Sequence, residues 1–298
     1  MFIFATSGKG GAGRSVVGAN VAYRSALTGR DTCYLDFSFA SPTAGTVFAV
    51  SAVAGGTSRG GTQSYLLAET SAPDRVDVWA GSDHPALRRR PPGAGQLVLF
   101  PGDRNGSEFV TTPTIDERCA KLLLHLAEEF QVVIVDLSAG RSFAVDMALA
   151  ATAMPVVRKV PSRWLVFHKW TRDHVTAAAG LVHDDRGLLK VARQRGHDAE
   201  AFEEGLHFVR TGVIDPYAEG ATLGQVQTEF LRACDRDLTR LAGGMGADRT
   251  TVPFDALLHG REQLICDDDQ HEQKIAGAGT VASFERLLTI VVEGEEAG

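Results

Sequence analysis

The sequence predicts an α/β fold in which a mainly parallel, twisted sheet carries helices on both faces. Short apolar runs alternate with amphipathic segments along all 298 residues, and glycines separate the first run from the first helix. The run QVVIVDLSAG (131–140) is almost continuously apolar, which is typical of a strand buried on both faces. Alternating strands and helices favour parallel pairing with right-handed crossovers. We therefore expect one three-layer domain over residues 1–298.

The individual elements follow from local patterns of apolar residues and turn residues. The expected strands are MFIFAT (1–6), DTCYLDF (31–37), VDVWA (76–80), QLVLFPGD (96–103), 131–140, PVVRKV (155–160) and 206–214. The expected helices are 15–27, 114–130 with Thr114 as N-cap, 142–153, a Trp-containing helix at 163–182, a charged stretch reaching 204, 221–243 and 279–292. Residues 51–75 are rich in Gly, Ser and Thr, so we expect a mobile insertion around one short helix.

Composition excludes several classes of protein. The net charge of −7 argues against a broadly basic surface for nucleic acid or membrane. The four cysteines form no C-x-C or C-x-x-C pair, so they give no support to a zinc or iron–sulfur site. Asp267, Asp268 and Asp269 lack the alternating ligands of a calcium loop and are expected in a solvated loop. With no signal peptide and no apolar run of ~18 residues, a soluble cytoplasmic protein without a transmembrane segment is expected.

The strongest functional signal is SGKGGAGRS at residues 7–15. Residues 8–15 fit the phosphate-binding pattern G-x-x-x-x-G-K-S/T, except that Arg14 stands at the lysine position. Glycines let the backbone wrap around phosphates, and the helix that follows contributes free amides. A serine in this position holds Mg²⁺ through its hydroxyl. The candidate nucleotide-binding residues are Gly8, Gly10, Gly11, Ala12, Gly13, Arg14, Ser15 and Val16, and a glycine turn that binds nothing is the alternative.

KGGAGRS resembles the deviant Walker A signature of the MinD/ParA family of P-loop ATPases. The resemblance implies the P-loop NTPase fold, ATP with Mg²⁺ as the cofactors, and a homodimer that sandwiches the nucleotide. By position, Lys9 would reach across to the partner's ATP; a solvent-facing loop lysine is the alternative. VVIVDLSAG resembles the family's Walker B strand, so Asp136 would join Ser15 as a metal site residue.

Two departures from the family pattern bear on catalysis. The switch strand, often D-x-D, reads YLDFSF here, with Asp36 first and Ser38 where the family's water-positioning aspartate stands. Serine is no general base at neutral pH, and the planar fork of Arg14 fits a phosphate pocket differently from a lysine. Phosphoryl transfer needs water, metal and cations placed together, so hydrolysis should suffer more than binding. Asp36 could take over as the polar group, which leaves a weak ATPase open, with Lys9, Asp36 and Ser38 as the catalytic candidates.

Two functions therefore stay open. The first is a nucleotide-dependent dimeric switch that acts on a protein partner, with ATP hydrolysis slow or lost. The second is a non-catalytic pseudo-ATPase regulator or scaffold whose nucleotide pocket is structural. The C-terminal stretch LTIVVEGEEAG is acidic, where a membrane-bound relative would carry a basic amphipathic helix, and the net charge disfavours non-specific nucleic-acid binding. Trp164 and Trp170 are expected to pack in the core, with an exposed partner-binding face as the alternative.

Overall fold

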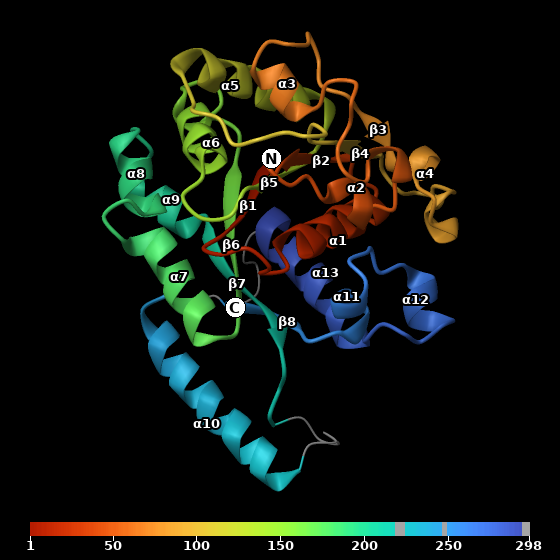
Figure 1. Ribbon diagram of the computed structural model, residues 1–298, viewed down its shortest axis with the longest axis vertical. Helices are drawn as coiled ribbons and strands as arrows, with labels where there is room; N and C mark the ends of the chain where they lie inside the picture. Colours follow the sequence, from red (N-terminus) through yellow and green to blue (C-terminus); the bar gives the residue numbers. More distant parts are fainter. Residues whose placement is uncertain (218–223, 246–248, 294–298) are drawn as a thin grey trace.

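An eight-stranded sheet forms the centre of the protein within the residues that the computed structural model describes, 1–217, 224–245 and 249–293 (Figure 1). Across the sheet the strands are β3 (Val76–Asp77), β4 (Leu97–Phe100), β2 (Thr32–Phe37), β5 (Val132–Leu137), β1 (Phe2–Ser7), β6 (Ser162–Lys169), β7 (Leu206–Val213) and β8 (Arg249–Pro253). Only the pair β3 and β4 among them is antiparallel. The predicted mainly parallel sheet is confirmed.

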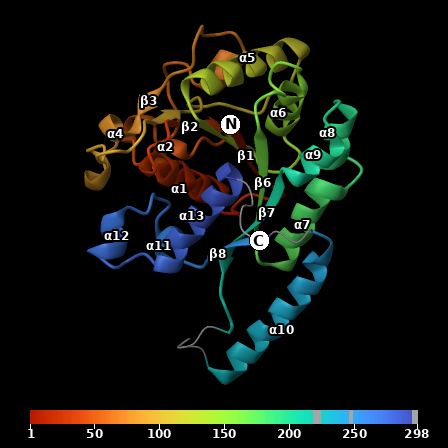
Figure 2. The same ribbon diagram turned by 180° about the vertical axis from the view of Figure 1, so that it is seen from behind.

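Helices cover both faces of this sheet, which confirms the three-layer architecture (Figures 1 and 2). One face carries α1 (Arg14–Leu27), α2 (Ala44–Val47), α4 (Val78–Gly81), α11 (Ala256–Gly260) and α13 (Ala278–Glu293). The other face carries α3 (Thr62–Leu66), α5 (Pro113–Glu129), α6 (Phe143–Ala153), α7 (Arg172–His183), α8 (Leu188–Gln194) and α9 (Ala199–Glu204). Helix α12 (Asp267–His271) lies at the edge of the first layer, and α10 (Gln225–Leu241) extends beyond the sheet.

Strand β1 shows how one apolar run serves two cores. Phe2 and Phe4 pack into the core beneath α5 and α6, whereas Ile3 and Ala5 pack into the core beneath α1 and α13. All four are fully buried, because successive strand residues point to opposite faces and both faces are covered. The phosphate-loop candidate follows directly from this central strand.

The prediction fails between residues 155 and 171. PVVRKV (155–160) is a turn and not a strand, and Val156 in it is 57% exposed. Residues 162–169 form β6, so the expected helix at 163–182 begins only at Arg172. Trp164 is 1% exposed and stacks on Phe4 with ring centroids 4.7 Å apart, which confirms core packing, though on a strand.

Smaller differences occur elsewhere. In VDVWA only Val76 and Asp77 form a strand; the Asp77 carboxylate accepts the Trp79 N–H at 3.0 Å and caps α4 instead. The N-cap of α5 is Thr112 and not Thr114, since a proline with its fixed φ occupies the first helical position. The sequence patterns did not predict β8, α11 or α12, and residues 221–223 of the helix expected at 221–243 lie outside the described ranges.

The insertion at 51–75 is tied to the ends of two strands. The Thr57 N–H donates to the Gly102 carbonyl at 2.9 Å, and the Asp103 carboxylate accepts the Gly61 N–H at 2.7 Å. The hydroxyl of Thr62 donates to the Asp36 carbonyl at 2.7 Å, so the insertion also contacts strand β2. Its mobility stays a prediction. Of the helices in the described ranges, none is long and apolar enough to cross a membrane.

Candidate functional site

The glycine loop connects the end of β1 to the start of α1, and its conformation requires glycine. Gly11 and Gly13 have φ of +71° and +75°, a region that L side chains rarely adopt. At Gly8 an added Cβ would lie 2.5 Å from the backbone of Ala177, because the loop packs directly on α7. A loop of this shape brings backbone amides and the α1 N-terminus to one point, which suits an anion.

Two adjoining cavities open over this loop. The first, of about 400 Å³, is lined by residues 10–16 of the loop together with Ser38, Ser138 and Ala139. The second, of about 240 Å³, shares the lining residues Gly11, Gly13 and Val16 with the first. It extends to Pro253 at the end of β8 and to Asp255 beyond it. The arrangement offers a polar compartment at the loop and a second compartment beside the segment that follows β8. Each candidate nucleotide-binding residue except Gly8 lines the first cavity.

Arg14 connects three parts of the site. Its Nε donates to the Asp136 carboxylate on β5, and its Nη2 donates to the Ser38 hydroxyl at 2.8 Å. Its Nη1 also lies 3.4 Å from the Ser7 hydroxyl. The ion pair is buried, since the Arg14 side chain is 10% exposed and that of Asp136 is inaccessible. The two residues that depart from the family pattern, Arg14 and Ser38, therefore contact each other.

Asp36 is fully occupied by the backbone that follows it. Its carboxylate accepts N–H groups from Ser38, Thr43 and Ala44, each at 3.0 Å, and so holds the turn that leads into α2. It lies beside Asp136 in the register of β2 and β5. Burial, and next the charge of Asp136, raise the pKa of Asp36 to about 7. A carboxylate used in this way is poorly placed to orient water.

Lys9 lies on the surface and does not line either loop cavity. Its Nζ pairs with the carboxylate of Asp173 in the first turn of α7, and the two side chains are 44% and 79% exposed. The hydrogen bond from Lys9 and its charge lower the pKa of Asp173. The lysine is thus held by its own chain, at a position that a second protein could reach.

The oxygen ligands for a magnesium ion are present in this site. Asp136 Oδ2 is buried and accepts no hydrogen bond from the described residues, while Oδ1 is taken by Arg14. Ser15 lines the cavity at the first turn of α1. A carboxylate oxygen and a hydroxyl are the ligand types that Mg²⁺ prefers, so the residues fit this ion.

Further residues belong to the site, and of these Thr211 lies in no motif. The Thr211 hydroxyl on β7 donates to the Ala12 carbonyl at 2.6 Å and so connects the glycine loop to β7. The Gly140 N–H after β5 donates to the Ser7 carbonyl at 2.7 Å and links the segment after β5 to the end of β1. Glu262 lines both cavities. Only the parallel order of β5, β1, β6 and β7 brings these segments together.

Comparison with solved structures identifies the fold. The MinC:MinD cell division protein complex of Aquifex aeolicus matches with a TM-score of 0.59 and 14% identity over 100% of this chain and 97% of that chain. A putative plasmid partition protein from Borrelia burgdorferi B31 bound to AMPPNP matches with a TM-score of 0.60 and 10% identity, covering 98% of each chain. MinD complexed with Mg-ADP from Pyrococcus horikoshii OT3 gives 0.55 and 12%, covering 97% and 95%.

These neighbours define the class of the protein as an α/β P-loop NTPase fold. Within that class, the fold is of the type found in the MinD and ParA ATPases. No family model and no curated protein sequence matches the chain. At identities of 10–16% the likeness to the solved structures shows the fold alone.

Proposed function

We propose that the chain is a MinD/ParA-like ATP-binding protein, a nucleotide-dependent dimeric switch that acts on a protein partner and hydrolyses ATP slowly or not at all. One observation carries this proposal: the guanidinium of Arg14 bridges Asp136 and Ser38 at the mouth of the glycine loop. The fold supports a nucleotide as the ligand. The contacts of Arg14 with Asp136 and Ser38 support slow or absent ATP hydrolysis.

Binding follows from the loop and from the charge of Arg14. Phosphate oxygens would be received by the loop amides and the α1 N-terminus, which carry partial positive charge. Arg14 lines the cavity and supplies a permanent cation beside them. Ser15 and Asp136 would hold Mg²⁺, which neutralises phosphate charge when bound. The compartment beside Pro253 and Asp255 has room for the remainder of a nucleotide.

Slow hydrolysis follows from the groups that surround the site of attack. Ser38 accepts a hydrogen bond from Arg14 and offers no carboxylate to orient water. Asp36, the nearest substitute, is committed to three backbone amides. Catalysis of phosphoryl transfer depends mainly on positioning and on electrostatic stabilisation, and both are weakened here. Binding of ATP does not require a water-positioning carboxylate at position 36 or 38.

Dimer formation rests on Lys9. Its exposed ion pair with Asp173 is a weak contact in water, so a partner's phosphate could compete for the lysine. Lys9 does not line its own loop cavities, which agrees with a role toward a second chain, as the MinD/ParA resemblance implies.

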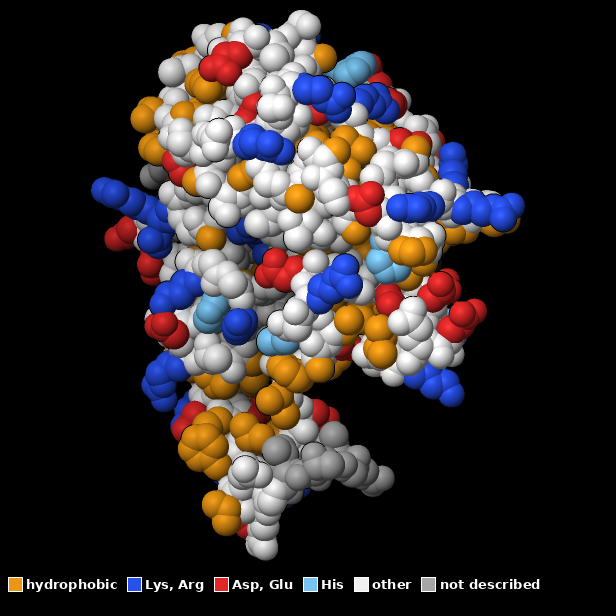
Figure 3. All heavy atoms as spheres, turned by 45° about the vertical axis from the view of Figure 1, so that its right-hand side comes forward, with side chains coloured by type: hydrophobic (Ala, Val, Ile, Leu, Met, Phe, Trp, Pro, Cys, Tyr) orange, Lys and Arg blue, Asp and Glu red, His pale blue; other side chains and the backbone are white. Residues whose placement is uncertain are grey.

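A protein partner is favoured over nucleic acid by the surface. Figure 3 shows apolar side chains gathered where α10 meets the end of the sheet. Val226 and Phe230 on α10 are 80% and 67% exposed, and Ile214, Tyr217 and Phe254 nearby in the fold are about half exposed. Exposed apolar patches mark protein–protein or membrane contacts, and the net charge of −7 disfavours nucleic acid.

One observation favours the second candidate, a pseudo-ATPase scaffold. Arg14 is paired with Asp136 and Ser38 within the chain, so a phosphate would have to compete with these two contacts for its guanidinium. In this alternative the glycine loop binds no ATP and the product of the fold is an interaction surface.

The dimeric switch is tested by light scattering with and without Mg-ATP. The chain of 31.8 kDa should double its mass with ATP, and Lys9→Ala should remain a monomer. Lys190→Ala is the matched control, because Lys190 forms a comparable exposed pair with Asp185 but lies away from the loop. A Lys9→Ala protein that still doubles its mass would contradict the role of Lys9 across the dimer. Absence of any ATP effect on the unmodified chain would favour the scaffold.

A further inference from the structure

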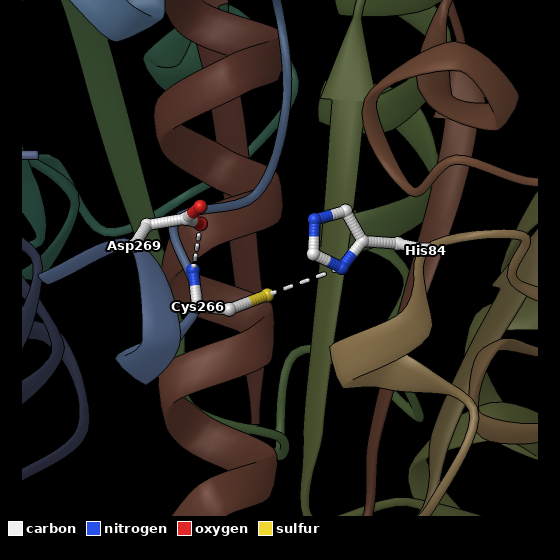
Figure 4. Close-up of side chains that lie close together, drawn as sticks. All are labelled: His84, Cys266 and Asp269. Atoms are coloured by element: carbon white, nitrogen blue, oxygen red, sulfur yellow. Dashed lines mark hydrogen bonds between the residues drawn. The ribbon is translucent and has the colours of Figure 1, made fainter. Parts of the chain in front are cut away.

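Three side chains with metal-ligand chemistry meet outside the two cavities over the glycine loop. They are His84, Cys266 and Asp269, and Figure 4 shows the imidazole and the thiol pointing toward one another from opposite segments. Cys266 Sγ lies 3.9 Å from His84 Nδ1, and one ligand atom from each of the three residues lies within 4.8 Å of the others. The expectation of a solvated loop at 267–269 is wrong in part: these residues form α12 and Asp269 is 2% exposed, whereas Asp267 and Asp268 are exposed.

The segment that carries Cys266 and Asp269 is fixed to α1. Asn20 accepts the Ile265 N–H at 2.8 Å, and Arg24 donates to the Ile265 carbonyl at 2.8 Å. Within the segment, the Cys266 N–H donates to Asp269 Oδ2 at 2.8 Å, which holds the carboxylate beside the thiol. The Asp269 N–H donates in return to the Cys266 carbonyl at 3.1 Å, so backbone and side chain together fix Asp269 at the start of α12.

The segment that carries His84 is fixed independently. His84 precedes the short 3₁₀ helix η2 (Pro85–Leu87). The Asp83 N–H donates to the Ala49 carbonyl at 2.7 Å, and the Asp83 carboxylate accepts the Ser51 N–H at 3.0 Å. Both halves of the cluster are therefore anchored by contacts that do not involve the cluster itself.

A cavity of about 710 Å³ reaches two of the three residues. His84 and Asp269 line it, together with Glu262 and Gln273, whereas Cys266 is 1% exposed and does not line it. A buried thiol in this position is unsuited to attack a substrate in the cavity. It is suited to bind an ion that enters from the cavity and keeps one open position facing it.

We propose that His84, Cys266 and Asp269 bind a divalent transition-metal ion of the Zn²⁺ type. Imidazole, thiolate and carboxylate together are ligands of this class, whereas Mg²⁺ and Ca²⁺ are bound by oxygen. In a tetrahedral zinc site with Zn–S near 2.3 Å and Zn–N near 2.0–2.1 Å, the sulfur and nitrogen are roughly 3.6 Å apart. The observed 3.9 Å needs a contraction of a few tenths of an ångström, and the three ligand atoms as a group, which lie within 4.8 Å of one another, need to close by up to about 1 Å.

The ion would bridge segments 182 residues apart in the chain, one after α4 and one at α12. Because the free protein already holds both segments close, binding the ion adds a cross-link without rearranging the fold. Zn²⁺ should therefore raise the unfolding midpoint through mass action on the folded state, by an amount that grows with the logarithm of the ratio of free Zn²⁺ to its dissociation constant. This site is independent of the glycine loop, so its failure would leave the proposed function untouched.

Cobalt titration of the nucleotide-free protein tests the site. Co²⁺ should bind one per chain with a thiolate-to-cobalt charge-transfer absorption, which Zn²⁺ then displaces. Cys266→Ser should remove that absorption, and Cys234→Ser, which changes a partly buried cysteine elsewhere, should keep it. His84→Ala and Asp269→Asn should weaken Zn²⁺ binding at least tenfold; asparagine keeps an oxygen for the Cys266 N–H.

The unmodified chain decides the proposal even if a variant does not fold. A cobalt spectrum without a thiolate band would overturn the site, as would Zn²⁺ binding that Cys266→Ser leaves unchanged. A band that appears in the unmodified chain and in Cys234→Ser, but not in Cys266→Ser, is the expected result.

Discussion

Replacing Arg14 with methionine removes the cation from a buried ion pair while keeping a side chain of similar length. Asp136 is inaccessible to solvent and its Oδ1 is held by Arg14, so the variant leaves a buried carboxylate without its cation. Breaking such a pair by removing one partner costs about 3–5 kcal/mol of folding free energy. For a chain of this size, a loss of about 3 kcal/mol lowers the thermal midpoint by roughly 5 °C.

The assay is urea unfolding at neutral pH, compared with Lys9→Met. That control also removes the cation of an ion pair with an aspartate, but Lys9 and Asp173 are exposed, so the loss of stability should be small. Arg14→Lys keeps the charge and loses the hydrogen bond to Ser38, and should fall between the two. Equal stability of Arg14→Met and Lys9→Met would refute the reasoning, because it would mean that the buried pair contributes no more than a surface pair.

Three other changes give measurable outcomes. Gly8→Ala forces a Cβ to within 2.5 Å of the α7 backbone, so the unfolding midpoint in urea should fall and ATP binding should weaken; unchanged values would contradict the packing. The pKa of Asp36 is raised from 3.8 to about 7, so the stability it contributes is fully present below pH 3.8 and is lost as pH rises through 7. Unfolding free energy should therefore drop by at most about 3 kcal/mol between pH 5 and 7.5, and Asp36→Asn should flatten this slope, whereas an equal slope would point to other groups. Restoring Arg14→Lys and Ser38→Asp together should raise phosphate release from ATP more than either change alone, and no gain would place the defect elsewhere.

Sequence patterns predicted the strand–helix–strand unit at the N-terminus because its apolar period changes abruptly from strand to helix, with glycines at the change. The same reasoning failed at β6. There Trp164 and Val166 face one core while Leu165 and Phe167 face the other, so the run is apolar throughout and has no strand period to read. The valines of 155–160 have a high strand propensity and so led to a strand prediction, although the segment is a turn.

Part of the candidate site could likewise be predicted from the sequence, and part could not. The glycine loop is contiguous in the chain, so its residues can be named from the sequence alone. The contact between Arg14 and Ser38 joins residues 24 positions apart, and only the pairing of β2 with β5 next to β1 brings Asp136 to both. His84 and Cys266, 182 residues apart, carry no spacing signal at all, which is why cysteine spacing gave no support to a metal.

Calorimetric titration of the purified chain with Mg-ATP tests the central claim most directly. Gly11→Val is the matched control, since a β-branched residue at φ +71° is strained and places a side chain on the cavity. The proposal predicts a saturable isotherm with one ATP per chain that Gly11→Val abolishes. No heat from the folded, unmodified chain would contradict it and leave the glycine loop without a nucleotide.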